Sequence, residues 1–273
     1  MSVADSNPSR RLALITGASA GMGEAFARAY AGRGLDVALV ARRADRLAAL
    51  ADELVLRHGV KAYVVPCDLA RWEAHADVLR AMDAEARVVD VLVNNAGFGV
   101  PQSYTRVDWS RQQDFLMTLV VNGCGLAHGV IPGMVERGWG RIINVASLAA
   151  FSPGAAGHTL YPAAKSFAVK FSQSLDAELR DKGVKVTAVC PGFTRTEFAA
   201  AEGLQDLMDQ APRRFWQSAE TVVRTAIDAN ERGRVTVVPG LHNQVAAILM
   251  RYLPEPLVAT LIRRGAAKYQ LKE

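Results

Sequence analysis

Cysteine is scarce in this sequence, and long uninterrupted apolar runs are absent. The three cysteines, Cys67, Cys124 and Cys190, lie far apart and form no C-x-x-C pair. This spacing excludes a disulfide framework and the common zinc sites, and it predicts buried thiols in a reducing cytoplasm. The five histidines show no metal-ligand spacing either. No run approaches the roughly 18 apolar residues that a membrane span requires.

The N-terminal segment, MSVADSNPSRR, lacks the apolar core of a secretion signal. We therefore expect a cytoplasmic protein in which residues 1–9 are disordered. Lysine and arginine exceed the acidic residues by five, and the isoelectric point is about 9.3. No basic run with interleaved aromatic residues occurs, so nucleic-acid binding is not expected. The positive charge instead fits an anionic cofactor or an anionic membrane surface.

Half of the 273 residues are hydrophobic, which is enough for one domain with a large core. Short β-branched runs alternate with longer segments of helical periodicity. The predicted strands are 12–16, 37–41, 62–66, 89–93, 141–145, 184–189 and 234–238, and the predicted helices include 23–33, 46–58, 72–85, 109–137 and 161–182. Such alternation forms right-handed βαβ units, hence a parallel sheet covered by helices on both faces. We predict a doubly wound α/β domain of about seven strands.

A cluster of glycines separates the first predicted strand from the first predicted helix. The segment reads LITGASAGMGEAF, with Gly17, Gly21 and Gly23 at its turn. Glycine weakens both helices and strands, whereas bare N–H groups at a helix N-terminus bind phosphate well. The spacing is neither a Walker A loop nor the G-x-G-x-x-G fingerprint. A plain tight turn is the alternative, but the strand-to-helix position favours dinucleotide binding.

The end of the second predicted strand indicates which dinucleotide is bound. In Rossmann-type folds an acidic residue at this point binds the adenosine ribose 2′-hydroxyl. Here the strand ends in Arg42 and Arg43. Two guanidinium groups can hold a 2′-phosphate through paired hydrogen bonds, so NADP(H) is favoured over NAD(H). The alternative is a solvated arginine pair at a helix start, a cluster that Arg46 continues.

A tyrosine and a lysine lie four positions apart where the helix 161–182 is predicted to begin. Pro162 is tolerated in a first helical turn, so Tyr161 and Lys165 are expected one turn apart on one face. Tyrosine has a reference pKa of about 10, and a nearby lysine cation stabilises its phenolate. Ser147 follows the fifth predicted strand, at the edge where open α/β sheets bind ligands. Together these residues predict acid–base catalysis by Tyr161.

Taken together, these motifs resemble the short-chain dehydrogenase/reductase family in its single-domain form. The resemblance covers residues 10–240, an NADP-binding Rossmann-type catalytic domain, and leaves 241–273 as a C-terminal helical extension. The matching pieces, in order, are Thr16-Gly17-Ala-Ser-Ala-Gly21-Met-Gly23, Cys67-Asp68-Leu69, Asn94-Asn95-Ala96-Gly97, Asn122, Ser147, Tyr161, Lys165 and Pro191-Gly192-Phe-Thr194-Arg-Thr196. The resemblance implies a doubly wound Rossmann-type sheet and a nicotinamide cofactor.

The resemblance also implies individual roles. Catalysis would depend on Ser147, Tyr161, Lys165 and Asn122, with Asn122 holding a water in a proton relay through Lys165. The cofactor-binding residues would be Gly17, Ser19, Gly21, Met22, Gly23, Arg42, Arg43, Asp68, Leu69, Asn95, Ala96, Gly97, Tyr161, Lys165, Pro191, Gly192, Thr194 and Thr196. Among them, Ser19 and Arg42 match contacts to a 2′-phosphate, Asp68 matches a contact to adenine, and Thr194 and Thr196 would position the carboxamide and diphosphate.

Structural alternatives exist for several of these positions. Asn94 and Asn95 are also ordinary turn residues at a strand end. Asn122 is unfavourable inside a helix, and Gly123 and Gly125 beside it predict a local irregularity that could serve packing alone. Thr194 and Thr196 lie in a Pro-Gly loop that requires polar residues in any case.

These roles imply an NADP(H)-dependent oxidoreductase that interconverts a ketone or aldehyde and its alcohol, with Tyr161 as general acid and base. The alternative is a non-catalytic NADP-sensing or scaffold protein on the same fold. Apolar residues after Pro191-Gly192, the family's lid region, favour a lipophilic substrate: Phe193, Phe198, Ala199, Ala200, Ala201, Leu204, Leu207, Met208, Phe215 and Trp216. A steroid, a fatty-acyl derivative and an aromatic ketone all fit this pattern.

The last 33 residues form a separate apolar and basic segment. Leu257, Val258, Leu261 and Ile262 recur at helical spacing after a break at Pro254 and Pro256, beside Arg263, Arg264 and Lys268. One use is peripheral contact with an anionic membrane; the other is packing on the same or a neighbouring subunit. We favour packing because the apolar stripe is short. The family resemblance implies a homodimer or homotetramer.

Overall fold

The computed structural model describes residues 10–154, 157, 159–197 and 213–266. Its central feature is a parallel sheet with the strand order β3-β2-β1-β4-β5-β6-β9. The strands are β1 (Leu12–Thr16), β2 (Asp36–Ala41), β3 (Ala62–Pro66), β4 (Val91–Asn94), β5 (Gly140–Val145), β6 (Val184–Val189) and β9 (Thr236–Val237). The predicted doubly wound fold of about seven strands is thus confirmed. The last strand is shorter than the predicted 234–238.

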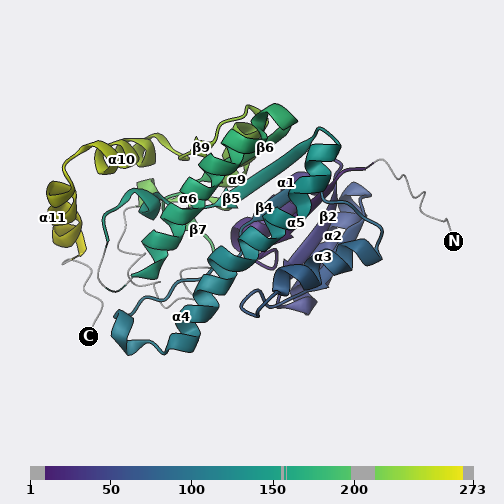
Figure 1. Cartoon of the computed structure of the whole chain (residues 1–273), viewed down its shortest axis with the longest axis horizontal. Coiled ribbons are helices and arrows are strands. Elements are labelled where there is room, and N and C mark those ends of the chain that lie inside the picture. The colour runs from purple at the N-terminus through teal and green to yellow at the C-terminus, as the bar shows by residue number, and fades with distance from the viewer. Residues whose placement is uncertain (1–9, 155–156, 158, 198–212, 267–273) are drawn as a thin grey trace.

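Helices cover both faces of this sheet (Figure 1). They are α1 (Gly21–Ala31), α2 (Ala44–His58), α3 (Ala74–Ala84), α4 (Trp109–Leu116), α5 (Asn122–Glu136), α6 (Leu160–Leu179), α9 (Ala219–Glu231), α10 (Leu241–Tyr252) and α11 (Glu255–Ala266). The first core layer joins α1, α2 and α9 to one face, through residues such as Phe26 and Leu39. The second joins α3, α5 and α6 to the other, through Leu92 and Leu126.

The inner strands of the sheet are largely apolar, as expected where helices cover both faces. In β1 every residue is buried, and in β6 all but Lys185 are. Fully buried strands of this kind are typical of parallel sheets. Because all strands run the same way, their carboxyl ends lie at one edge, and the loops that follow β1, β4 and β5 meet there. That edge collects the sequence motifs.

The long apolar helix predicted at 109–137 is continuous but irregular. A π-helical stretch, Met117–Val121, separates α4 from α5, as the glycines after Asn122 led us to expect. By length and composition, Trp109–Glu136 is apolar enough to cross a membrane, contrary to the sequence-based expectation. Leu126, Ala127 and Met134 on this helix are fully buried against the sheet. The helix is therefore explained as a core element of the domain.

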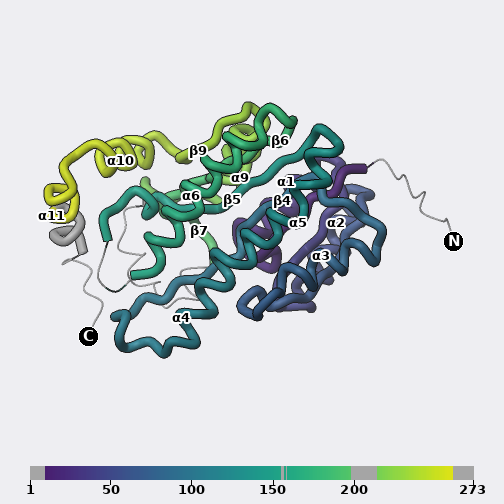
Figure 2. The backbone as a smooth tube through the Cα atoms, in the orientation of Figure 1, coloured from purple at the N-terminus to yellow at the C-terminus, as the bar shows by residue number. Residues whose placement is uncertain are grey.

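Figure 2 shows the C-terminal helices at the end of the molecule opposite α2 and α3. In the extension, α10 ends at Tyr252, and α11 begins at Glu255 with Pro256 in its first turn. A short two-stranded ribbon, β7 (Thr194–Arg195) with β8 (Gln217–Ser218), lies before α9. The predicted disordered residues 1–9 and the lid residues 198–212 lie outside the described part of the chain.

Candidate active site

The glycine loop connects β1 to α1 in a conformation that requires glycine. Gly17 and Gly21 have φ values of +67° and +58°, which lie in the left-handed region. A Cβ atom on Gly23 would lie 2.1 Å from the Gly17 carbonyl oxygen, so a side chain there would displace backbone. No side chain caps the N-terminus of α1. Its first N–H groups therefore remain available to an anion.

Asn95 ties this loop to the end of β4. Its backbone N–H and that of Ala96 both donate to the Thr16 hydroxyl at 2.9 Å, and its side-chain amide donates to the Thr16 carbonyl at 2.8 Å. Asn94 donates to the Gly123 carbonyl and to the Asn144 side chain. These bonds cross from β4 to β1, β5 and α5. Asn94 and Asn95 thus do more than end a strand: they hold the edge of the sheet together.

The residues expected around the adenosine half lie at the ends of β2 and β3. Arg43 donates to the Ser19 hydroxyl through Nε at 3.1 Å and Nη2 at 3.0 Å. The structure thus brings Arg43 to the glycine loop, and both Arg42 and Arg43 are exposed. Asp68 accepts from the Ala70 N–H at 3.0 Å, in a local turn that follows β3. Ser19 and Arg43, two residues expected to bind a 2′-phosphate, therefore lie side by side.

Tyr161 and Lys165 lie one turn apart at the start of α6, and Ser147 follows β5. The ammonium of Lys165 donates to the Val145 carbonyl at 2.8 Å and lies 5.6 Å from the centre of the Tyr161 ring. Lys165 is only 8% exposed, and burial lowers its pKa to about 8. The Ser147 hydroxyl accepts from the Ala149 N–H at 3.2 Å, which orients the serine at the carboxyl end of the sheet.

Asn122 is completely buried at the junction of the π-helical stretch and α5. Its side-chain oxygen accepts from the His75 backbone and from His75 Nδ1, at 2.9 and 2.8 Å. Its amide donates to the carbonyls of Leu69 and Arg71. All four hydrogen bonds of the side chain therefore go to residues 69–75, the segment that leads into α3. They join this segment to the start of α5. The predicted water relay through Asn122 remains a proposal.

The sequence analysis did not identify His75 as a partner of Asn122, although Gly125 is a sequence feature connected with it. A Cβ atom on Gly125 would lie 2.4 Å from the His75 ring. The small residue one turn after Asn122 therefore makes room for this histidine. Only the pairing of α3 with α5 shows why glycine stands there.

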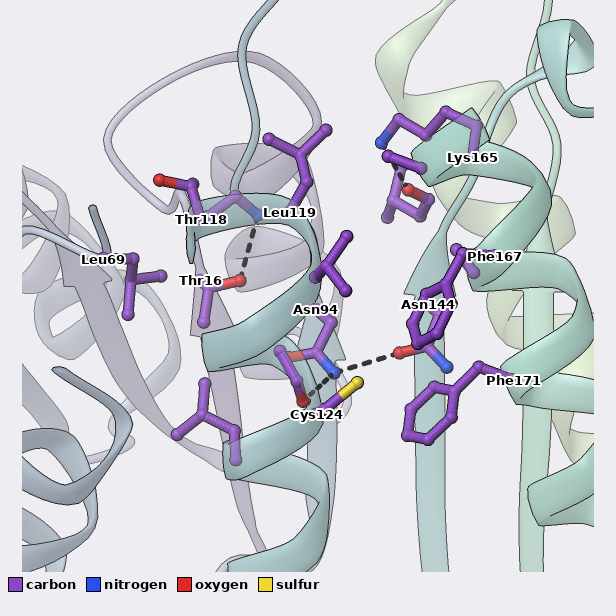
Figure 3. Close-up of a pocket in the computed structure, with 17 residues that line it drawn as sticks. Thr16, Leu69, Asn94, Thr118, Leu119, Cys124, Asn144, Lys165, Phe167 and Phe171 are labelled. Atoms are coloured by element: carbon purple, nitrogen blue, oxygen red, sulfur yellow. Dashed lines mark hydrogen bonds between the residues drawn. The ribbon is translucent and has the colours of Figure 1, made fainter. Parts of the chain in front are cut away.

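A small pocket, partly open to solvent, lies between α5 and α6 with Lys165 at one end (Figure 3). Thr118, Leu119 and Cys124 line one side, and Phe167 and Phe171 line the other. The expectation that all cysteines are buried is wrong for Cys124, which is only partly buried. The oxygen of the Asn94 side chain is buried without a hydrogen-bond partner among the described residues.

A second, smaller pocket lies beside Tyr161. Val100, Tyr104, Phe115 and Leu160 contribute its apolar lining, and two glutamines contribute polar atoms. Val100 and Tyr104 belong to a segment in which the sequence shows no helical or strand periodicity, so the sequence analysis did not single them out.

The Pro191–Glu197 segment returns to the glycine loop. Thr194 is buried and donates to the Gly192 carbonyl at 3.1 Å. The side chain of Thr196 lies so close to Gly21 that a Cβ atom there would be 2.9 Å from it. Thr196 is thus near the N-terminus of α1, whereas Thr194 supports the turn.

Comparisons with known proteins agree with this geometry. The family described as short chain dehydrogenase matches residues 11–206. An uncharacterized oxidoreductase of Myxococcus xanthus is 36% identical over 256 residues, 94% of this chain and 98% of that protein. A short-chain dehydrogenase from Sphingobium yanoikuyae, solved in complex with NADPH, has a TM-score of 0.78 and 29% identity, with 96% of each chain covered. A bulky-bulky ketone specific alcohol dehydrogenase from Comamonas testosteroni has a TM-score of 0.74 and 27% identity, covering 96% of this chain and 95% of that one. The chain therefore belongs to the short-chain dehydrogenase/reductase family and is an oxidoreductase that acts on CH–OH groups.

Proposed function

We propose that the protein uses NADP(H) to interconvert a lipophilic ketone or aldehyde and its alcohol, with Tyr161 as general acid and base. The observation that carries this proposal is the Tyr161–Lys165 pair. The two residues lie at the start of α6, and the Lys165 ammonium is buried 5.6 Å from the tyrosine ring centre. A buried cation this close to the ring is positioned to stabilise the phenolate form of Tyr161.

The chain's own residues would move the proton. The nicotinamide cofactor, when bound, supplies the hydride. In the reducing direction Tyr161 donates its hydroxyl proton to the substrate oxygen, while Ser147 donates a hydrogen bond that stabilises negative charge there. Lys165 stabilises the resulting phenolate, and Asn122 would support the route by which Tyr161 is reprotonated. The glycine loop would hold the diphosphate through the uncapped N-terminus of α1.

The preference for NADP(H) is supported by the arginines after β2. Arg43 already contacts Ser19 in the glycine loop, and Arg42 and Arg46 lie beside it in sequence. No acidic residue ends β2, so this strand itself lacks the carboxylate that the 2′-hydroxyl of NAD(H) would use. The Sphingobium yanoikuyae protein, which was solved with NADPH, provides a parallel.

A lipophilic carbonyl substrate is supported by the apolar lining beside Tyr161 and by the ketone specificity of the Comamonas testosteroni enzyme. Phe193 and Trp216, with ring centres 5.7 Å apart, extend the apolar surface near the Pro191–Glu197 segment. The alternative, a non-catalytic NADP sensor, is disfavoured because Ser147, Tyr161 and Lys165 are all retained. Steroid, fatty-acyl and aromatic ketones remain the candidate classes.

We expect purified protein to oxidise NADPH when a ketone or aldehyde from these three classes is added. The measurement is the loss of nicotinamide absorbance with each compound, in parallel with NADPH and NADH. The rate with the best compound should be at least tenfold higher with NADPH at equal subsaturating concentration, because each charged hydrogen bond to a phosphate contributes about 1.5–3 kcal/mol. Binding of NADPH without turnover of any class would instead favour the sensor.

The α10 helix offers a surface for assembly in a cytoplasmic protein. Its inner side carries the buried residues Asn243 and Ala247, and Asn243 donates to the Pro239 carbonyl at 2.8 Å. Its outer side exposes Leu241, Val245, Ile248, Leu249 and Tyr252, which recur at helical spacing. We propose that this stripe contacts another subunit of a homodimer or homotetramer, in preference to a membrane. The stripe is apolar, whereas Arg251 is the only arginine or lysine of α10.

The double substitution Val245→Glu and Ile248→Glu should convert the protein to a smaller species in light-scattering and sizing experiments. Two carboxylates placed in an apolar contact would cost several kcal/mol of association energy. Leu56→Glu on α2, at 90% exposure, is the matched control and should leave the size unchanged. The intact protein should not sediment with anionic liposomes. Salt-sensitive sedimentation that the double substitution abolishes would reverse the assignment in favour of a membrane contact.

A further inference from the structure

Glu197, which follows Thr196, forms ion pairs with Arg43 and Arg46, the arginines at the start of α2. Its carboxylate oxygens lie 3.0 and 2.7 Å from Arg46 Nη1, and one of them lies 3.5 Å from Arg43 Nη1. The same Arg43 side chain contacts the Ser19 hydroxyl. A single carboxylate therefore bridges two arginines that are separated from it by about 150 positions in the sequence. No sequence pattern predicts this contact.

The position of these arginines favours an anion. Arg43 is the N-cap residue of α2, and Arg46 lies in its first turn, where Asp45 is the acidic residue. Cations at a helix N-terminus are unfavourable, because the helix dipole places partial positive charge there. No side chain caps α2. An anion at this point is stabilised both by the helix end and by the guanidinium groups, and the interaction with Arg46 holds the pKa of Glu197 below its usual range.

On these grounds we infer that Glu197 is an intramolecular competitor of the 2′-phosphate, occupying the guanidinium groups of Arg43 and Arg46 when no phosphorylated cofactor is bound. This inference rests on the proposed NADP(H) site. A 2′-phosphate carries the same kind of oxygen acceptors and more negative charge than a carboxylate. When it binds, it must displace Glu197 or lie beside it at a repulsive distance. Glu197 therefore lowers the affinity for NADP(H) and does not affect NAD(H), which lacks this phosphate.

The position of the Glu197 carboxylate depends on the contacts made by the residues just before it. Thr196 packs against Gly21, and Thr194 is held in β7 opposite Gln217. These contacts anchor the segment at the N-terminus of α1, immediately before the carboxylate. The anchored backbone therefore places Glu197 next to the two arginines. Its side chain is 58% exposed, so it can turn into solvent without leaving a buried charge.

The test is the substitution Glu197→Gln, which keeps the shape of the side chain and removes its charge. Dissociation constants for NADPH, NADH and adenosine 2′,5′-bisphosphate are measured by fluorescence titration and calorimetry on the full chain. We expect the variant to bind NADPH and the bisphosphate about two- to fivefold more tightly, the range expected for a solvent-exposed ion pair. Affinity for NADH should not change. The gain should shrink at 1 M salt, where the screening length is about 3 Å.

Three further variants isolate the effect of the Glu197 carboxylate. Glu178→Gln removes an exposed carboxylate on α6 that forms no ion pair with a described residue, and it should change no affinity. Arg43→Gln should weaken NADPH roughly 10- to 150-fold, whether residue 197 is Glu or Gln, because it removes the phosphate contact itself. Glu197→Ala should reproduce the gain of Glu197→Gln if the carboxylate alone is responsible.

Different results would contradict the proposed preference for NADP(H) and the inferred competition by Glu197. If the wild type binds NADH as tightly as NADPH but Glu197→Gln gains affinity for NADPH, the proposed cofactor preference is wrong and the competition by Glu197 stands. If the wild type prefers NADPH and Glu197→Gln leaves that affinity unchanged or weakens it, the competition is refuted. A weaker affinity would mean that Glu197 orients the arginines toward the phosphate.

Discussion

Replacing Tyr161 with Phe should reduce carbonyl turnover by about 10²–10⁴-fold, the range typical for loss of a general acid–base group. The substitution keeps the ring, its packing and its 5.6 Å distance to Lys165, and it removes only the hydroxyl. Because Tyr161 is proposed to act on the substrate oxygen, the loss should appear in kcat at saturating substrate. Affinity for NADPH should persist.

The measurement compares steady-state turnover with NADPH binding by fluorescence titration. Tyr252→Phe, at a tyrosine that is 73% exposed on α10, is the matched control and should retain full activity. A Tyr161→Phe protein with near-native turnover would refute the assignment of Tyr161 as proton donor. If the wild type also lacked turnover while binding NADPH, the non-catalytic alternative would gain support.

Replacing Lys165 with Met should reduce activity by at least about 10²-fold while stabilising the fold at neutral pH. The activity falls because the phenolate of Tyr161 loses its cation. The stability rises because a buried ammonium is unfavourable: burial lowers the pKa of Lys165 from 10.5 to about 8. That difference corresponds to about 3 kcal/mol. Loss of the hydrogen bond to the Val145 carbonyl offsets part of it, at about 1–3 kcal/mol.

The stability difference between the wild type and Lys165→Met should change sign with pH. Below pH 8 Lys165 is charged in both the folded and the unfolded chain, so the full cost of burial is present in the wild type. Between pH 8 and 10.5 the folded protein has lost the proton that the unfolded chain still binds, so wild-type stability rises relative to the variant. Above that range only the lost hydrogen bond remains, and Lys165→Met should be the less stable protein.

Urea denaturation of both proteins across this pH range provides the measurement. Lys170→Met, at an exposed lysine on the same helix, should show no such crossover. A stability difference that does not vary with pH would contradict the charged, buried state of Lys165. The expected combination, a more stable but inactive enzyme, is the usual relation between a strained functional group and its fold.

The proposed catalytic pair could be predicted from the sequence because its two residues are close together in the chain. Tyr161 and Lys165 are four positions apart, and helical geometry alone places them on one face. The glycine loop was equally readable, since the left-handed φ values of Gly17 and Gly21 explain why glycine stands there. Alternation of strands and helices, with the right-handed crossover rule, likewise leads to a parallel sheet whose carboxyl edge gathers these motifs.

Contacts between segments that are far apart in the sequence could not be predicted from local patterns. Whether Arg42 or Arg43 reaches Ser19 depends on the direction in which the chain leaves β2, and a shift of one residue reverses it. The exposed apolar stripe of α10 required knowledge of which side the rest of the molecule covers.

By itself, the sequence determined the fold class, the glycine loop and the Tyr161–Lys165 pair, because each depends on local backbone geometry and on the period of apolar residues. Only the tertiary structure decided that Asn122 is held by His75 and that Glu197 bridges Arg43 and Arg46. Those partners lie from 47 to more than 150 positions apart. They meet because the strand order of the sheet places the ends of β2, β3 and β6 around one edge, and no local period encodes that order.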